Sequence, residues 1–193
     1  MICLAEKKDA VQIAEIHKSE IKKGFLSSLK VIFLKNLYLV IIESEYGFCI
    51  VAKEKSSVIG FISGVTDINK LYFYFLKKYF FKSVVLIFQK FFSISFLKKT
   101  FETLFYPIKE NKLPHAELLT MAVLRQFQGQ GIAGKMFSQF IVEMKKRNIK
   151  SFKVLVGEEL SAAINFYEKN GFSFLKQMSV HDNKISRIYI YNL

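Results

Sequence analysis

The residues with the clearest chemical meaning form a glycine-rich turn between a strand-like run and a helix-like run. They are Gln128, Gly129, Gln130, Gly131, Ile132, Ala133, Gly134 and Lys135. A glycine-rich turn that leads into a helix offers free backbone N–H groups and the positive end of the helix dipole, which together hold phosphate oxygens. The sequence therefore predicts that a phosphorylated cofactor binds at this turn.

Three phosphate-binding patterns compete for these residues. The dinucleotide pattern G-x-G-x-x-G matches by letter, but it requires glycines directly at the end of a strand in a long run of βαβ units. The nucleotide P-loop pattern fails because Met136 stands where a Ser or Thr must bind magnesium. The third pattern, Gln/Arg-x-x-Gly-x-Gly/Ala, is met by Gln128, Gly131 and Ala133. The strand before the turn and the helix after it favour this third pattern.

A single carboxylate lies at the start of the apolar strand that precedes the turn. If this strand alternates regularly, Glu117 shares one face with Met121 and Val123. A carboxylate in this setting costs free energy unless it is solvated or paired, so either Glu117 faces a substrate or a lysine pairs with it. His115 lies two residues earlier, on the same predicted face, and is the alternative proton acceptor.

The other polar candidates do not assemble into a catalytic set. His17, His181 and Asp182 do not have the arrangement of a nucleophile triad, and Cys3 and Cys49 lie in apolar strand candidates without a histidine beside them. No acidic or histidine cluster has the spacing of metal ligands. We therefore expect neither a covalent acyl-enzyme nor a metal site.

The elements that must position these residues alternate between strands and helices. Predicted strands are 2–5, 48–52, 58–63, 117–123, 152–156, 172–180 and 184–191. Predicted helices are 10–23, 30–42, 133–146 and 161–170. Asp9 is the expected N-cap of the first helix and Gly24 its expected end. This alternation, with antiparallel strands at the C-terminus, predicts an α/β fold (an α+β mixed sheet).

Residues 70–112 differ in character from the rest of the chain. They hold nine lysines, ten Phe and four Tyr but no glycine, a mixture that predicts two basic amphipathic helices, at 71–79 and 83–105. Their aromatic side chains either cover the core, with the lysines solvated, or form an acceptor-site lid, a homodimer surface or a peripheral contact with an anionic membrane. The sequence leaves these alternatives open.

Composition indicates a single domain over residues 1–193. The chain is 51% hydrophobic, with 21 Phe and 9 Tyr, and its two cysteines make no disulfide framework. It shows no apolar leader and no run of about 18–20 apolar residues, so we expect a cytoplasmic protein. The formal charge of +13, from 29 basic and 16 acidic residues, favours anionic partners. No nucleic-acid-binding signature accompanies this charge, so we do not expect nucleic acid as a partner.

A second motif lies downstream of the turn. The stretch 163–172 reads Ala-x-x-x-Tyr-x-x-x-Gly-Phe, with Tyr167 at its centre and Gly171 where a left-handed cap would end the helix. Together with the turn and the element order, this stretch resembles the GNAT superfamily of acyl-CoA-dependent N-acetyltransferases. The resemblance is close over 113–175, weaker over 1–66 and absent over 70–112.

The resemblance implies a GNAT-like fold, in which helices flank a largely antiparallel, splayed central sheet and residues 70–112 form a helical insertion between the third and fourth strands. It implies acetyl-CoA as the cosubstrate and no metal. The pantetheine would pair with the last residues of the strand before the turn, as an added strand does, and the pyrophosphate would lie on the turn. The implied cofactor contacts are Met121, Ala122, Val123, the turn residues Gln128 to Gly134, Lys135 and Phe166.

The resemblance also implies a reaction. The acceptor amine attacks the thioester directly, in a ternary complex, after Glu117 has accepted a proton from it, and N–H groups near Ala122 stabilise the oxyanion. An alkyl ammonium group, with a pKa of ~10, must lose this proton before it attacks. Tyr167 then protonates the departing thiolate, since a phenol keeps its proton at pH 7. The sequence departs from many relatives at Leu160, where they have asparagine, and Ser161 is the expected substitute as a helix N-cap.

The acceptor follows less directly from the sequence. The basic, aromatic insertion favours a small amine with a phosphate or nucleotide handle, such as an amino sugar linked to a nucleotide or a lipid carrier. The insertion also resembles those of some bacterial GNAT proteins that act on precursors of cell-surface polysaccharide, which implies an acceptor of that class. This acceptor predicts a closed pocket roofed by Phe25, Leu26 and the insertion, whereas a peptide predicts an open groove. Protein N-terminal or lysine acetylation is the enzymatic alternative. A non-catalytic CoA-binding module, regulatory or membrane-associated, is the non-enzymatic one.

Overall fold

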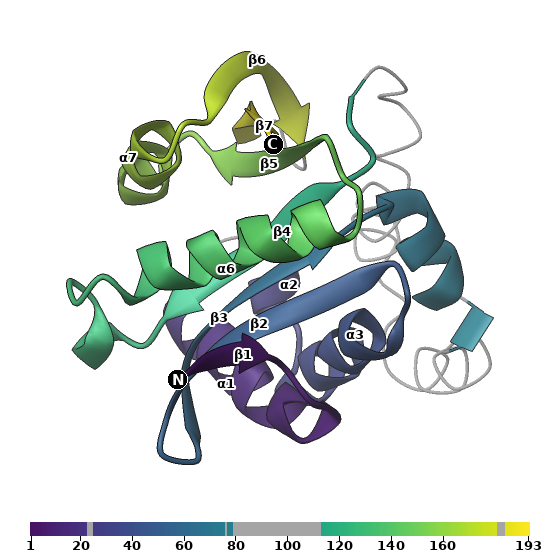
Figure 1. The fold of residues 1–193 in the computed structure, drawn as a ribbon, viewed down its shortest axis with the longest axis vertical. Helices are drawn as coiled ribbons and strands as arrows, with labels where there is room; N and C mark the ends of the chain where they lie inside the picture. Colours follow the sequence, from purple (N-terminus) through teal and green to yellow (C-terminus); the bar gives the residue numbers. More distant parts are fainter. Residues whose placement is uncertain (23–24, 76, 79–112, 181–183) are drawn as a thin grey trace.

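A computed structural model describes residues 1–22, 25–75, 77–78, 113–180 and 184–193 of the chain (Figure 1). Its strands are β1 (Ile2–Leu4), β2 (Gly47–Glu54), β3 (Ser57–Val65), β4 (Glu117–Val123), β5 (Ser151–Gly157), β6 (Ser173–Val180) and β7 (Lys184–Asn192). Its helices are α1 (Ala10–Glu20), α2 (Phe25–Ser28), α3 (Val31–Glu43), α6 (Ile132–Lys146) and α7 (Ser161–Lys169), with short 3-10 helices η1 (Lys7–Asp9) and η3 (Arg125–Phe127). Residues 68–75 and 77–78 are also helical.

The strands form one seven-stranded sheet with the order β1-β2-β3-β4-β5-β7-β6. Neighbouring strands are antiparallel except β4 and β5, which run parallel. Figure 1 shows α6 crossing one side of the sheet, with α1 and α3 on the other side. The predicted α/β fold, a mixed and largely antiparallel sheet flanked by helices, is confirmed.

Each face of the sheet has its own hydrophobic core. On one face α1 and α3 cover β2 and β3, and on the other α6 and α7 contribute to a second core with β2–β5 and β7. Packing of α6 on β3 is close because residue 64 is a glycine. A Cβ atom there would come within 2.4 Å of the Phe140 ring of α6. This contact holds α6, and with it the glycine-rich turn at its start, against the sheet.

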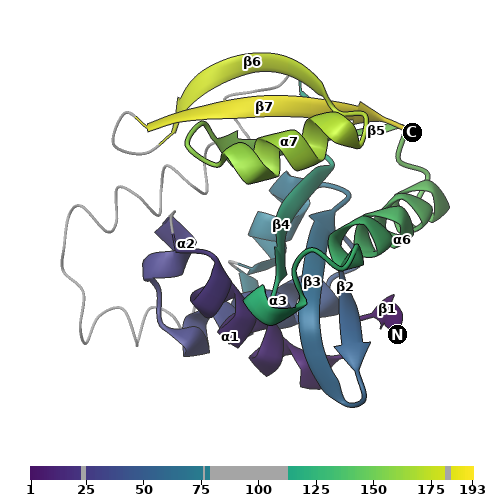
Figure 2. The same ribbon diagram turned by 90° about the vertical axis from the view of Figure 1, so that its left-hand side faces the viewer.

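The parallel pair of β4 and β5 is short, because the two strands diverge after two residue pairs. The pairs are Glu117 with Lys153 and Leu118 with Val154. Beyond them, among the described strands, β4 pairs with β3 alone and β5 with β7 alone. Figure 2 shows β5–β7 and α7 as an upper layer that leans away from β4. We call the free edges, residues 119–123 of β4 and 155–157 of β5, the splayed edges.

Neither predicted helix cap makes a side-chain capping bond. Asp9 occupies the N-cap position of α1, as predicted, but it has helical dihedral angles and makes no capping bond. Its carboxylate instead accepts from the N–H of Glu6 and lies 2.7 Å from the Lys53 ammonium, because a buried carboxylate is stabilised more by a buried cation than by a cap. Ser161 does not cap α7 either, since the N-cap position falls on Leu160 and no side chain makes the bond.

Several other predictions concern residues that lie wholly or partly outside the described part of the chain. The second insertion helix (83–105) and the turn at 181–183 lie outside them, as does Gly24, the expected end of the first helix; α1 already ends at Glu20. The first insertion helix is described in part and begins at residue 68, three residues earlier than predicted. Across the described part of the chain, no helix is long and apolar enough to span a membrane.

Candidate functional site

The glycine-rich turn lies at the N-terminus of α6 and is largely exposed. Gly129 and Gly131 have φ angles of 76° and 74°, which residues with a Cβ rarely adopt, and Gly131 is the N-cap of α6. A Cβ atom added to Gly129, Gly131 or Gly134 would meet no described atom within 4 Å. Glycine is therefore needed at 129 and 131 for the backbone conformation, and the space above all three residues is open to a ligand.

The turn presents backbone donors that the protein itself does not use. The first hydrogen bond of α6 runs from the N–H of Lys135 to the carbonyl of Gly131, and no side chain caps the helix. Within the part of the chain that the structure covers, the N–H groups from Gly129 to Gly134 have no acceptor. Free N–H groups at the start of a helix bind anions. The turn therefore has the geometry of a phosphate site.

Gln128 has a role that the sequence prediction missed. Its side-chain Nε2 donates to the carbonyl of Val123 at 2.8 Å, and its backbone N–H donates to the carbonyl of Arg125 at 3.2 Å. The N–H of Gln128 is thus occupied inside the turn, unlike those of the six residues after it. The side chain ties the turn to the end of β4. Glutamine and arginine, the two residues that the pattern allows at this position, both have a donor at the tip of a long side chain.

A β-bulge interrupts the regular alternation that the sequence predicted for β4. The pairing of β4 with β3 shifts by one residue, which places Leu119 and Thr120 together in the bulge. After the bulge, Met121 and Val123 pack in the core on the α6 side. Glu117 lies before the bulge, on the face of Leu119, which packs toward α1 and α3. The prediction that Glu117 shares a face with Met121 and Val123 is therefore wrong.

Glu117 and Lys153 form a buried ion pair at the point where β4 and β5 meet. Glu117 Oε2 lies 3.4 Å from Lys153 Nζ, and the two side chains are only 11% and 3% exposed. The Lys153 ammonium also donates to the carbonyl of Pro114. Burial raises the pKa of Glu117, and Lys153 opposes part of this rise. The lysine partner anticipated as one explanation of Glu117 is thus present, while the raised pKa makes the carboxylate a better proton acceptor than an exposed one.

His115, the alternative proton acceptor, is exposed and lies beside the helical residues that start at 68. Its Nδ1 is 3.1 Å from the side-chain nitrogen of Asn69, and its carbonyl accepts from the N–H of Ile68 at 3.0 Å. Because the Asn69 amide is the donor, Nδ1 is the acceptor and the ring proton belongs on Nε2. His115 is the more accessible of the two candidates.

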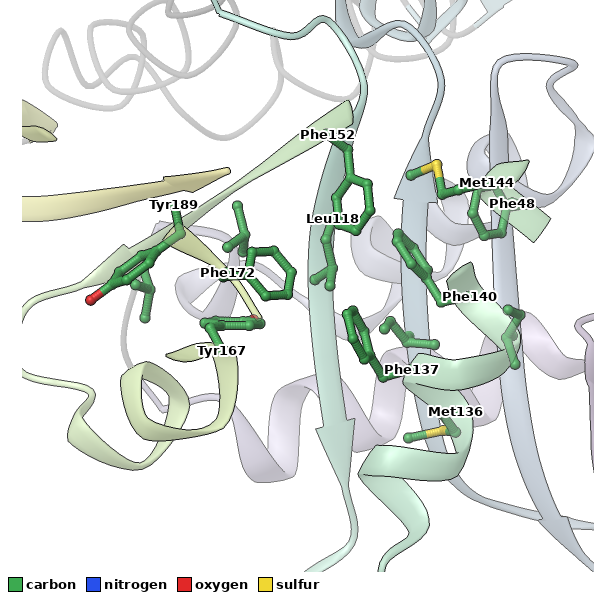
Figure 3. Packing of buried hydrophobic residues seen from close by; sticks show 14 of the residues in the cluster. Phe48, Leu118, Met136, Phe137, Phe140, Met144, Phe152, Tyr167, Phe172 and Tyr189 are labelled. Atoms are coloured by element: carbon green, nitrogen blue, oxygen red, sulfur yellow. The ribbon is translucent and has the colours of Figure 1, made fainter. Parts of the chain in front are cut away.

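Tyr167 projects from α7 toward β4. Its ring packs against Phe172, with 5.0 Å between centroids, and against Phe166 at 5.8 Å, and only 6% of the residue is exposed. Figure 3 shows the ring between α7 and β4, beneath Phe172. No described residue hydrogen-bonds to its hydroxyl, and burial raises the pKa of Tyr167. The phenol therefore keeps its proton at neutral pH.

The described site matches the chemical parts of acetyl-CoA. The turn has free donors that suit a pyrophosphate, the splayed edge of β4 has backbone groups that suit the amides of pantetheine, and Tyr167 projects from α7 toward β4. Phe166 is half-buried, and its ring packs nearly perpendicular to that of the core residue Phe137, with 5.9 Å between centroids, so part of the Phe166 ring is already used in packing. In the described ranges no three His, Cys, Asp or Glu side chains gather as a metal site. This combination suits a ligand that has a pyrophosphate and a chain of amides, as coenzyme A has.

The chain belongs to the acetyltransferase (GNAT) family, which it matches over residues 12–172. It is an acyl-CoA N-acyltransferase, and acetyl-CoA is its cosubstrate. No curated protein matches the chain by sequence.

Several solved structures share the fold at low sequence identity. Ard1 from Thermoplasma volcanium is 16% identical, with a TM-score of 0.63 over 100% of this chain and 97% of that one. PaiA N-acetyltransferase from Thermoplasma acidophilum, in complex with coenzyme A, is 17% identical, with a TM-score of 0.59 over 99% and 98%. The ribosomal-protein-S18-alanine N-acetyltransferase from Escherichia coli is 15% identical, with a TM-score of 0.60 over 100% and 92%. At these identities the likeness shows a common fold.

We expect Gly131→Ala to weaken the binding of acetyl-CoA roughly tenfold. A Cβ at a φ of 74° costs about 1–2 kcal/mol, and relief of this strain turns the N–H groups of the turn away from the phosphates. Calorimetric titration with acetyl-CoA measures the affinity. Gly134→Ala is the stability control, because residue 134 is helical and alanine is the better helix former. Equal losses of unfolding free energy in both variants would show that residue 131 has no special conformational demand.

Proposed function

We propose that the enzyme acetylates a small primary amine that carries a phosphate or nucleotide handle, and that this acceptor is an amino sugar. The observation that carries the proposal is the free positive charge beside α2, the segment predicted to roof the acceptor. The net charge of +13 supports the same class of acceptor, because it attracts anionic molecules to the enzyme.

Two lysines flank α2 at its ends. Lys22 and Lys30 are both exposed, and neither forms an ion pair with a described residue. Lys18 Nζ donates to the carbonyl groups of Ser27 at 2.5 Å and Leu29 at 3.0 Å, which holds the segment against α1. Free ammonium groups on a segment that is held in place suit a phosphate, because they contribute attraction without a competing carboxylate.

Part of the predicted roof of the acceptor pocket is described. Leu26 packs, half-buried, against the core formed by α1 and α3. The Phe25 side chain and most of the insertion lie outside the described residues. From this region, the proposal therefore uses only Leu26 and the two flanking lysines.

In the proposed mechanism the amine attacks directly and the protein moves two protons. Acetyl-CoA supplies the activated acetyl group as a thioester. Glu117 accepts the proton of the acceptor ammonium through a water, because its side chain is only 11% exposed, and Lys153 holds the carboxylate in place. Tyr167 donates its proton to the departing thiolate. The N–H groups of the splayed β4 edge orient the carbonyl of the thioester.

A panel of amines with a free-thiol readout tests the proposal. We expect a nucleotide-linked amino sugar to release thiol from acetyl-CoA faster than the same sugar without the nucleotide, because only the former has a handle for the lysines. Peptides with a free N-terminus, or with a blocked N-terminus and an internal lysine, complete the panel. Turnover of the peptides alone would contradict the proposal and establish the protein N-terminal or lysine acetyltransferase. Structures of that kind, such as the S18-alanine enzyme, share this fold.

Variants of the two candidate bases, assayed with the same amines, show which of the two residues accepts the proton. Glu117→Gln should lower the rate with the best amine and abolish the acidic limb of its pH profile, whereas His115→Gln should leave that limb in place. The reverse result would assign proton transfer to His115 and leave Glu117 as the partner of Lys153. Micromolar binding of acetyl-CoA without thiol release from any amine would favour a CoA-binding regulatory module.

A further inference from the structure

A groove lies beside the glycine-rich turn, between the start of β1, the hairpin that joins β2 and β3, and the start of α6. Figure 1 shows these three segments together at the lower left of the molecule. The groove has a volume of about 400 Å³, and none of the described residues that line it belongs to β4, β5 or α7. Ligand pockets in proteins commonly have volumes of about 300–1,000 Å³. This groove, which we call the hairpin groove, is therefore large enough for a small molecule and separate from the splayed edges and Tyr167.

Part of the lining of the hairpin groove is apolar. This part consists of Ile2, Ala52, Ile59, Phe127 and Ile132. All five residues either belong to the hydrophobic core on the α6 side of the sheet or pack against it. Apolar surface that a ligand covers is removed from water, which is favourable. The groove therefore suits a ligand with an apolar body.

The rim of the hairpin groove carries charged side chains that the fold does not use. Lys55, Lys135 and Glu54 are exposed, and none of them forms an ion pair with a described residue. Lys53 also lines the groove, but its ammonium lies 2.7 Å from the Asp9 carboxylate. Two free lysines and one free glutamate leave a net charge of +1 on the rim. This charge complements a ligand with a single negative charge, such as a carboxylate, better than a doubly charged phosphate.

The backbone at Lys55 supports a binding role for its side chain. Its φ of 52° lies in the left-handed region, which among the described non-glycine residues only Lys55 and Asn148 adopt. Asparagine and glycine tolerate this region, whereas a lysine there has a steric cost. Asparagine or glycine would also suit a tight hairpin turn better. The hairpin therefore presents an ammonium group to the groove at a cost in stability.

We propose that the hairpin groove binds a small amphiphilic carboxylate, with its apolar body on the apolar lining and its carboxylate between Lys55 and Lys135. Gln130 and Ile132 line the groove and also belong to the turn that is proposed to hold the pyrophosphate of acetyl-CoA. The two ligands thus approach one turn from different sides. Because both are anions, each should weaken the binding of the other, and by the same factor. The groove is then a regulatory site, and this role does not depend on the identity of the acceptor amine.

Calorimetric titration with octanoate tests the inference without coenzyme A or any amine. We expect octanoate to bind at one site per chain. Octanol lacks the negative charge and acetate lacks the apolar body, so both should bind at least about tenfold more weakly than octanoate. Absence of octanoate binding, or an equal affinity for octanol or acetate, would overturn the inference.

Variants of the rim show whether octanoate binds in the hairpin groove. Lys55→Asn should weaken octanoate binding about tenfold, because it removes a charged partner of the carboxylate. It should not reduce the free energy of unfolding, since asparagine adopts the left-handed region more readily than lysine. Glu54→Gln should act in the opposite direction and strengthen octanoate binding, because it removes the negative charge from the rim. Wild-type affinity in both variants would overturn the inference.

Lys146→Gln is the matched control. Lys146 is exposed in the last turn of α6, at the end of the helix away from the groove, and its loss changes the net charge as much as Lys55→Asn does. We expect Lys146→Gln to bind octanoate as the wild type does. Equal losses in Lys146→Gln and Lys55→Asn would show that octanoate is attracted by the overall positive charge alone, and would overturn the inference.

Titrations with acetyl-CoA, without and with saturating octanoate, test the regulatory role. We expect octanoate to lower the affinity of the wild type for acetyl-CoA about fivefold. At the same octanoate concentration Lys55→Asn should show a smaller effect, because less octanoate is bound. An affinity that octanoate does not change would overturn the regulatory role. An equal effect in both proteins would place octanoate in the coenzyme site instead, and would overturn the inference.

Discussion

Tyr167→Phe should lower kcat roughly 100-fold or more while the affinity for acetyl-CoA stays close to that of the wild type. The substitution removes only the hydroxyl, and the ring keeps its contacts with Phe166 and Phe172. Because no described residue hydrogen-bonds to that hydroxyl, its removal leaves no unpaired partner in the protein. The expected fall in kcat reflects the loss of the group that donates a proton to the thiolate. Steady-state kinetics give kcat, and calorimetry gives the affinity.

Tyr191→Phe is the control for this effect. Tyr191 belongs to the same aromatic group, with its ring 5.1 Å from Phe172 and 5.2 Å from Phe152, but it lies on β7 rather than α7. We expect its kcat to be unchanged. If Tyr167→Phe instead reduced the affinity for acetyl-CoA and left kcat intact, the tyrosine would be a binding residue, and the proposed proton transfer would have to be withdrawn.

Lys153→Met should reduce the free energy of unfolding by about 3–5 kcal/mol, because it leaves the Glu117 carboxylate buried without its cation. Methionine fills a similar volume, so packing is largely preserved. In a chain of this size such a loss corresponds to a fall in Tm of about 10 °C. Thermal and denaturant unfolding measure it. Replacement of Glu117 as well, in Lys153→Met/Glu117→Gln, should recover part of the loss.

The loss of unfolding free energy in Lys153→Met should depend on pH. Burial already raises the pKa of Glu117, and without Lys153 no other described residue opposes that rise. A carboxyl group whose pKa is higher in the folded state than in the unfolded state destabilises the fold as pH rises through these values. The deficit of Lys153→Met should therefore be larger at pH 8 than at pH 5. A deficit that is the same at both values, and the same in the double variant, would show that packing rather than charge is lost.

Local patterns in the sequence were sufficient to predict the conformation of the glycine-rich turn and of α7. The glycines of the turn were predicted from the need for free N–H groups, and two of them have the positive φ angles that only glycine adopts readily. The stretch 163–172 predicted α7 and its end, and Gly171 has a φ of 89°. The alternation of strands and helices likewise predicted most of the order of elements along the chain. These features depend on residues that are neighbours in the chain.

The features that the sequence did not specify depend on residues that are far apart in the chain. Lys153 lies in β5, and only the parallel register of β4 and β5 places it beside Glu117. The bulge at 119–120 follows from pairing with β3, so regular alternation could not predict which face Glu117 occupies. The buried contact between His17 of α1 and Tyr38 of α3 also joins residues that are far apart in the chain. Such partners are selected by tertiary packing, which has no local signature.

The divergence of β4 and β5 has a consequence for solubility. A strand with unpaired N–H and C=O groups is a template for another chain, and proteins normally shorten or cover such an edge to avoid aggregation. Here the free edges lie in the middle of the strand order rather than at its ends, since β4 and β5 are adjacent in the sheet. One outer edge is the three-residue strand β1, too short to recruit a partner readily. The enzyme thus keeps unpaired hydrogen-bonding groups available to a small molecule while neighbouring strands hinder their use by a second polypeptide.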